Sequence, residues 1–195
     1  TGAAFWKSVQ ATCDATAAKP PSELGKRIAQ TAIDEFVRFG GHQVVSKGGL
    51  FHFGLTEAEH EEDDRGARQA SLGHLGWWQV MKYWRSLYGD DATDKLEVLG
   101  YRDASTLTQE AQTALLRTSA AQLLRLAKDV ADPAMREIVR EAALRAALVD
   151  TSWSAAFISY VIRQSGVGVD AFRFANAHRV YIYDAFAISA AELSK

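Results

Sequence analysis

Residues 153–161 read Trp153-Ser154-Ala155-Ala156-Phe157-Ile158-Ser159-Tyr160-Val161, and this stretch decides the fold we expect for the chain. Its apolar side chains recur at three- and four-residue spacings, which predicts a helix with one buried face. We expect that helix to begin near Ser152 and to end before Gly166. Ser154 then falls in the first turn, where unpaired backbone N–H groups and the helix dipole stabilise negative charge.

A histidine at position 178 is the candidate partner of Ser154. A serine hydroxyl is scarcely ionised at neutral pH and needs a neighbouring base before it can attack. His178 can be that base if the fold brings it within about 3 Å. The alternative is structural, with Ser154 as a helix cap or a small packed residue and His178 as a histidine at a turn. A third group should orient the imidazole, and Asp184, Asn176 and Glu35 are available.

Glu35 suggests a different chemistry. It lies in a predicted helix that starts after Ser22 and ends at Gly40-Gly41. A half-buried carboxylate there is suited to act as a general acid in glycan cleavage. The alternative is an ordinary carboxylate on the helix surface.

The remaining pattern is mainly helical. Short strands or a hairpin are expected within 42–56. Helices are expected over 71–88, from Thr106 or Thr108 through Leu126, and after the Asp132-Pro133 pair, which is typical of a helix start. Residues 178–183 are compatible with a strand or with a helix through Ala190. We expect an N-terminal segment and linker at 1–21 and one domain at 22–195.

Composition excludes several classes of function. The chain has 195 residues and a net charge of −2, so bulk electrostatics gives no support to nucleic-acid binding. No apolar run is long enough to predict a membrane span, and no signal peptide is visible. Cys13 is the only cysteine and follows no zinc pattern, and the histidines form no metal-ligand pair. We therefore expect no metal and no cofactor.

Four blocks of sequence resemble the bacterial family catalogued as domain of unknown function 2272, and together they frame residues 28–186. The stretch from about 103 to 149 then looks like a helical insertion between the second and third blocks. The blocks are Ala32-Ile33-Asp34-Glu35-Phe36 with Phe39-Gly40, Val80 to Tyr83-Trp84, Trp153 to Ser159, and Phe174 with Ala177-His178, Tyr181-Ile182 and Ala185.

The third block is also similar to the Trp-Cys-Ala-Ala-Phe motif of papain-like cell-wall amidases and endopeptidases of the NlpC and CHAP types. This resemblance implies an α+β fold with a papain-like core, helix content well above strand content, and a histidine on a small antiparallel sheet. It places Ser154 on the nucleophile, where the family carries cysteine, and His178 on the base. Trp153, Tyr181 and Trp84 are expected to contact substrate.

The resemblance further implies a function. It suggests a hydrolase of peptidoglycan stem peptides that acts in the periplasm or after secretion, in some cases as an antibacterial effector with an immunity or inhibitor protein as partner. Two alternatives stay open: a muramidase-like enzyme that uses Glu35, and an inactive module that binds the cell wall or a protein.

Overall fold

A computed structural model provides the fold of the chain. It describes residues 18–45, 47–52, 54–55, 76–99 and 117–193, together with Gly2, Ala3, Lys7, Gln10, Ala11 and Asp14. Cys13 lies outside the described residues. The helices are α2 (Glu23–Arg38), α4 (Gly76–Tyr88), α5 (Ala92–Lys95), α7 (Ala120–Ala127), α8 (Pro133–Asp150), α9 (Ser154–Gln164) and α10 (His178–Leu193), with a 3-10 turn, η1, at Gly89–Asp91. The strands are β1 (Gln43–Val44), β2 (Leu50–His52), β3 (Glu97–Leu99) and β4 (Arg117–Ser119).

Helix α2 begins and ends where its sequence predicts. The Ser22 hydroxyl accepts a hydrogen bond of 3.0 Å from the Gly25 N–H, which pairs one of the free donors of the first turn. Gly40 and Gly41 follow with φ angles of 81° and 63°, a left-handed conformation that glycine adopts without steric cost. The chain therefore leaves the helix sharply and turns into the β1–β2 hairpin.

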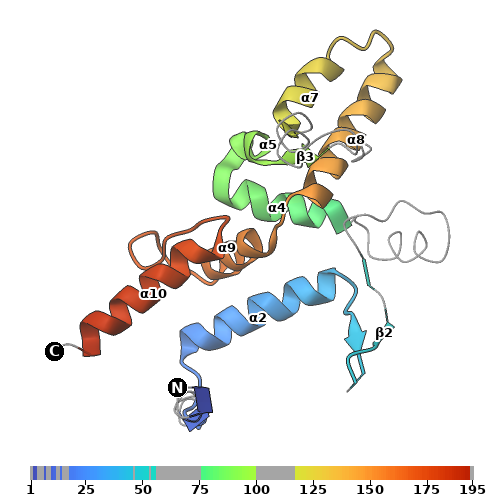
Figure 1. Cartoon of the computed structure of the whole chain (residues 1–195). Coiled ribbons are helices and arrows are strands. Elements are labelled where there is room, and N and C mark those ends of the chain that lie inside the picture. The colour runs from blue at the N-terminus through green and yellow to red at the C-terminus, as the bar shows by residue number, and fades with distance from the viewer. Residues whose placement is uncertain are drawn as a thin grey trace.

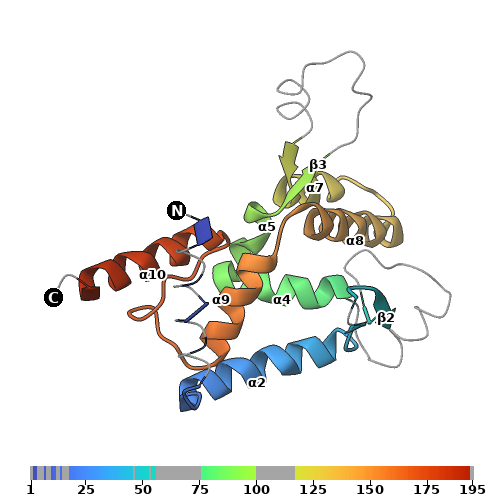
Figure 2. The same ribbon diagram turned by 60° about the horizontal axis from the view of Figure 1, so that its bottom comes forward.

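The core is built around α4. Its large side chains Trp77, Tyr83 and Trp84 are almost completely buried. Helix α9 packs against both α4 and α2, and Figure 2 shows it running between these two helices. The burial of this much aromatic surface supplies the main driving force for holding the three helices together.

A second layer is formed by α7, α8 and the short strand pair β3–β4. Asp132 caps α8 through a hydrogen bond of 2.8 Å from the Met135 N–H, and Pro133 occupies the first turn, as predicted. The expected helix through Leu126 is wrong at residues 117–119, because these residues form β4 and Ser119 caps a shorter helix. The rest of that prediction, through residue 116, lies outside the described residues.

The molecule is an α+β protein in which helix greatly exceeds strand, as expected. The described strands form two separate antiparallel pairs, β1–β2 and β3–β4. The papain-like arrangement is not confirmed, since His178 lies on neither pair and instead begins α10. The alanine-rich second half of α10 favours a helix, and the helix includes residues 180–183 although their Val, Tyr and Ile side chains favour a strand. Figure 1 shows α10 in red, leading away from α9 to the C-terminus.

Candidate functional site

Ser154 is the first residue of α9. The residue before it, Trp153, makes no side-chain capping bond, so no side chain at the cap pairs the first N–H groups of the helix. The first N–H in the helical ladder is that of Phe157, which donates to the Trp153 carbonyl at 2.9 Å. The Ser154 side chain is exposed to solvent. A nucleophilic oxygen here would lie beside backbone donors and the positive end of the helix dipole.

His178 lies beside Ser154. The distance from Ser154 Oγ to His178 Nε2 is 2.8 Å, which is a hydrogen bond. Both residues are exposed, so a substrate in solution can reach them. The fold therefore brings together the two residues that the sequence singled out, and it does so at the start of two helices instead of between a helix and a sheet.

A buried serine sets the position of His178. The Ser159 hydroxyl, which has no exposed surface, donates to the Ala175 carbonyl at 2.7 Å and accepts from the Ala175 N–H at 3.0 Å. These two bonds tie the loop before α10 to α9 at a point three residues ahead of His178. Sequence reasoning missed this role of Ser159, although a hydroxyl within an apolar helical face was a possible indication of it.

The second imidazole nitrogen of His178 contacts the Tyr181 hydroxyl. When Nε2 accepts the serine proton, Nδ1 carries a hydrogen and donates it to the Tyr181 oxygen. Burial raises the pKa of Tyr181, so the phenol stays neutral. Tyr181 was expected to contact substrate, but the structure places its hydroxyl on the base.

None of the three residues expected to orient His178 does so. Asp184 forms an ion pair with Arg173, with distances of 2.6 and 2.8 Å from its two carboxylate oxygens. Asn176 makes no hydrogen bond to the ring in the described structure, and Glu35 lies in the core on α2. Tyr181 takes this position because it lies one helical turn after His178 on the same face of α10.

Glu35 is buried, with only 3% of its surface exposed. Its carboxylate accepts hydrogen bonds from Lys82 at 2.9 Å, Tyr83 at 3.0 Å and Tyr160 at 3.1 Å, as well as from Gln79. Burial acts to raise its pKa, but the bonds from Lys82, Tyr83 and Gln79 and the charge of Lys82 together lower it.

An ionised Glu35 cannot donate a proton to a glycosidic oxygen, because a general acid must be protonated when the bond breaks. The predicted role of Glu35 as a general acid therefore gains no support from its surroundings. Its donors come from α4 and α9, while Glu35 belongs to α2. The carboxylate instead joins the three helices that build the site.

A pocket of about 380 Å³ opens next to Ser154. Most of its wall is apolar or aromatic, and Phe39 stacks on Trp153 with ring centroids 5.8 Å apart. Trp153 therefore lies where a substrate contact was expected. Trp84 does not, since it has no exposed surface and belongs to the core. The lining residues are Ala32, Glu35, Phe36, Phe39, His42, Leu55, Tyr83, Trp153, Ser154 and Phe157.

His42 adds a polar group to this pocket that sequence reasoning did not single out. Its Nδ1 accepts a hydrogen bond of 3.1 Å from the Gly54 N–H, so the hydrogen of the neutral ring sits on Nε2. Gly54 is required for this approach: a Cβ there would lie 1.7 Å from the Phe39 carbonyl oxygen. The neighbouring Leu55 N–H donates to the same oxygen at 2.6 Å, which fixes this side of the pocket.

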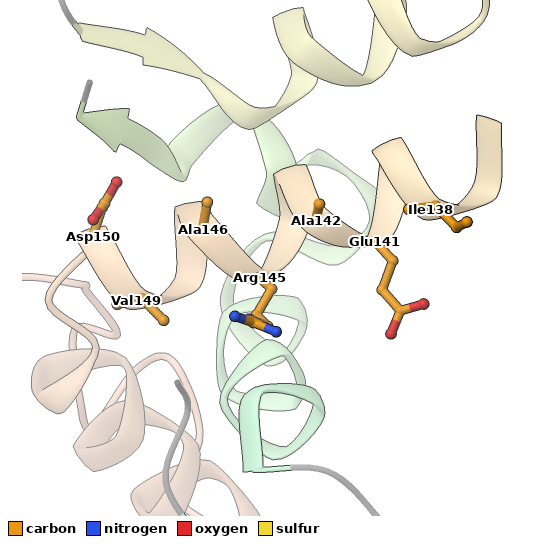
Figure 3. A pocket seen from close by; sticks show the side chains of 7 residues that line it. All are labelled: Ile138, Glu141, Ala142, Arg145, Ala146, Val149 and Asp150. Atoms are coloured by element: carbon orange, nitrogen blue, oxygen red, sulfur yellow. The ribbon is translucent and has the colours of Figure 1, made fainter. Parts of the chain in front are cut away.

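A second hollow runs along one face of α8 (Figure 3). All of its lining residues belong to that helix, and Glu141 and Arg145 leave the helix on the same side. The lining includes no hydroxyl, thiol or imidazole, and its two carboxylates are those of Glu141 and Asp150. Asp150 already accepts a hydrogen bond of 2.9 Å from the Leu99 N–H, so this hollow lacks a hydrogen-bonded nucleophile and base like Ser154 and His178. In the described parts of the chain no cluster of three or more His, Cys, Asp or Glu side chains suits a metal ion. No described helix has the length and apolar character to cross a membrane.

Fold and site together define a helix-rich α+β protein with an exposed serine–histidine pair beside an apolar pocket. The chain belongs to a family of uncharacterised proteins conserved in bacteria, DUF2272, whose model matches residues 72–194. The match includes Ser154, His178 and Tyr181, whereas Glu35, Phe39 and His42 precede it. No curated protein matches the chain, and neither does any solved structure.

Proposed function

We propose that this protein is a serine-dependent acyl hydrolase that cleaves amide bonds in the stem peptides of bacterial peptidoglycan. The observation that carries the proposal is the 2.8 Å hydrogen bond between Ser154 Oγ and His178 Nε2, at an exposed helix N-terminus. Nucleophile, base and helix N-terminal donors are the groups that acyl transfer requires. The choice of peptidoglycan rests on the resemblance of Trp153 to Phe157 to the motif of cell-wall amidases.

The reaction follows from the positions of these groups. Ser154 Oγ attacks the carbonyl carbon while its proton passes to His178 Nε2. First-turn N–H groups of α9 stabilise the oxyanion, and Tyr181 holds the imidazole by its other nitrogen. Nε2 then protonates the leaving amine and an acyl-serine remains. His178 next takes a proton from water, which hydrolyses the acyl-serine and restores Ser154.

Such an enzyme would act where peptidoglycan is accessible, in the periplasm or outside the cell. If it is delivered into competing bacteria, an immunity or inhibitor protein that covers Ser154 is the expected partner. The location and the immunity partner both follow from peptidoglycan as the substrate, so they fail if peptidoglycan is not cleaved.

The test is digestion of purified sacculi followed by mass spectrometry of the soluble fragments. Wild-type protein is expected to release fragments with new amide-derived carboxyl ends, and Ser154→Ala and His178→Ala to release none. Ser152→Ala is the matched control, because Ser152 is an exposed serine two positions before Ser154 and precedes the helix that carries the pair's nucleophile. It should behave as wild type.

Other outcomes separate the alternatives. New reducing sugar ends that vanish with Glu35→Gln would favour glycan cleavage and contradict the proposal. Intact sacculi that still bind the protein would favour a binding module. Intact sacculi combined with Ser154-dependent cleavage of small esters would keep the serine chemistry and reject peptidoglycan as the substrate.

A further inference from the structure

The pocket beside Ser154 carries an inference about which part of the substrate it binds. Its wall is formed by the side chains of Phe36, Phe39, Leu55, Trp153 and Phe157, from α2, the Gly54–Leu55 segment and the start of α9. Phe36 is 48% exposed although it is a large apolar side chain. An apolar pocket of this size with a nucleophile at its rim is typical of a small-molecule binding site.

The charged group of this pocket is already neutralised within the protein. Glu35 accepts hydrogen bonds from Lys82, Tyr83 and Tyr160, and Tyr83 donates its own hydroxyl to that carboxylate. Glu35 also forms an ion pair with Arg38 at 3.7 Å, and neither Lys82 nor Arg38 lines the pocket. The pocket wall therefore has no unpaired carboxylate that could select a cationic ligand. The pocket therefore suits a neutral, apolar group.

The position of His178 shows on which side of the scissile bond the apolar substrate group in the pocket must lie. In acyl transfer the protonated imidazole gives its proton to the leaving group, so the leaving group must lie on the histidine side of the nucleophile. Among the described residues that line the pocket none comes from α10, and His178 is not one of them. The pocket thus lies on the other side of Ser154, where the acyl part of the substrate must extend.

We propose that this pocket binds an apolar acyl group, namely the side chain or chain attached to the carbonyl that Ser154 attacks. The proposal rests on the proposed function, since it assigns a role relative to the acyl-serine. It gives the substrate preference as amides or esters with an apolar group next to the scissile carbonyl, and the alanine residues of a stem peptide are the matching acyl groups in peptidoglycan. The Nε2–H of His42, which has no bond to another described residue, is available to a polar atom of the same acyl part.

The experiment measures kcat/KM of the full chain on p-nitrophenyl acetate, butyrate and hexanoate. Burial of each added methylene is expected to raise kcat/KM about fourfold, or about fifteenfold from acetate to butyrate, which adds two methylenes. Ala32→Phe fills the pocket from α2 and should abolish most of that gain. Ala29→Phe is the matched control on the same helix, because Ala29 is exposed and does not line the pocket; its butyrate-to-acetate ratio should equal that of wild type.

The two possible failures are distinguishable. If no ester is cleaved faster by wild type than by Ser154→Ala, the proposed function fails and the inference falls with it. If cleavage depends on Ser154 but kcat/KM does not rise with acyl length, the inference fails while the function stands. The wild-type length series decides this point even if Ala32→Phe does not fold. The inference would also be overturned if the ratio of kcat/KM on butyrate to kcat/KM on acetate were the same in Ala32→Phe as in Ala29→Phe.

Discussion

The imidazole of His178 is held between two hydroxyl groups, one from Ser154 on Nε2 and one from Tyr181 on Nδ1. Most serine–histidine sites place a carboxylate in the second position, where it stabilises the charged imidazolium. Here the group is a phenol whose pKa burial raises, so it orients the ring without adding a negative charge. The imidazolium that forms during catalysis is therefore stabilised less here than at a site with a carboxylate.

Replacement of Tyr181 by phenylalanine tests this arrangement. The ring keeps its stacking on Phe172, at 5.2 Å between centroids, but the bond to Nδ1 is lost. We expect kcat on p-nitrophenyl butyrate to fall about tenfold with little change in KM, the effect of one neutral hydrogen bond. ¹⁵N NMR should show that the Nδ1–H tautomer of His178 is no longer dominant.

Tyr183→Phe is the matched control, since Tyr183 lies on the same helix and is 72% exposed. It should leave both kcat and the histidine spectrum unchanged. A Tyr181→Phe variant with the tautomer and activity of wild type would show that the phenol only packs against the ring.

At the level of elements, the site depends on how the loop before α10 is attached to α9. Ser159 makes both of its bonds to the backbone of Ala175, and this attachment lies between the two helices that carry the reacting groups. Helix α10 has few other contacts with the rest of the described structure. The Ser154–His178 distance should therefore depend strongly on this one hydroxyl.

Ser159→Ala removes that attachment and leaves the N–H and carbonyl of Ala175 without their partner. We expect a loss of about 1–3 kcal/mol in the free energy of unfolding and a fall of more than tenfold in kcat. Ser165→Ala is the control, because Ser165 is also buried, at the far end of α9, and bonds to Val161 and Thr31. It should lower stability comparably, as measured by urea unfolding, and keep activity. Equal activities in the two variants would contradict the role given to Ser159.

The elements that sequence predicted well are those with strong local patterns. Ser22 and the Asp132-Pro133 pair mark helix starts through contacts within four residues, and the structure confirms both. Strand β4 was missed because its pairing with β3 joins distant residues, such as Leu99 and Arg117. The placement of His178 on a helix contradicts the strand implied by the papain-like resemblance. Local preference could not predict it, because residues 180–183 favour a strand and the alanines after them favour a helix.

On the scale of the whole molecule, Glu35 connects the helices that support the site. Its partners Gln79 and Tyr160 lie 44 and 125 positions away in the chain, so no sequence pattern could have identified them. Sequence alone favoured an acid for catalysis or a surface carboxylate. The structure shows a buried carboxylate that joins α2 to α4 and α9 and whose pKa its hydrogen-bond donors lower.

This position of Glu35 makes the stability of the fold depend on pH. The pKa of Glu35 is lower in the folded protein than its ordinary value of 4.5, so the folded state favours the ionised form. Its contribution is therefore fully present above about pH 4.5 and is lost as pH falls through the lower folded pKa.

Glu35→Gln should lower the free energy of unfolding at pH 7 by about 2–4 kcal/mol, because the ammonium of Lys82 loses its counter-charge. The difference from wild type should shrink as pH falls below 4.5. Urea unfolding at pH 7 and at pH 3.5 measures both effects. Glu137→Gln, which breaks an exposed ion pair with Arg140, should cost less than 1 kcal/mol at either pH. A Glu35→Gln variant as stable as Glu137→Gln would refute this role.

Labelling with a fluorophosphonate probe tests most directly whether His178 activates Ser154. The probe forms an Oγ–P bond with an activated serine and releases fluoride, without any need to know the substrate. The account predicts one adduct on Ser154 in the wild-type protein, located by tandem mass spectrometry, with no adduct in His178→Ala and none on the exposed Ser152. An unlabelled Ser154, or labelling at the same rate in His178→Ala, would contradict the account.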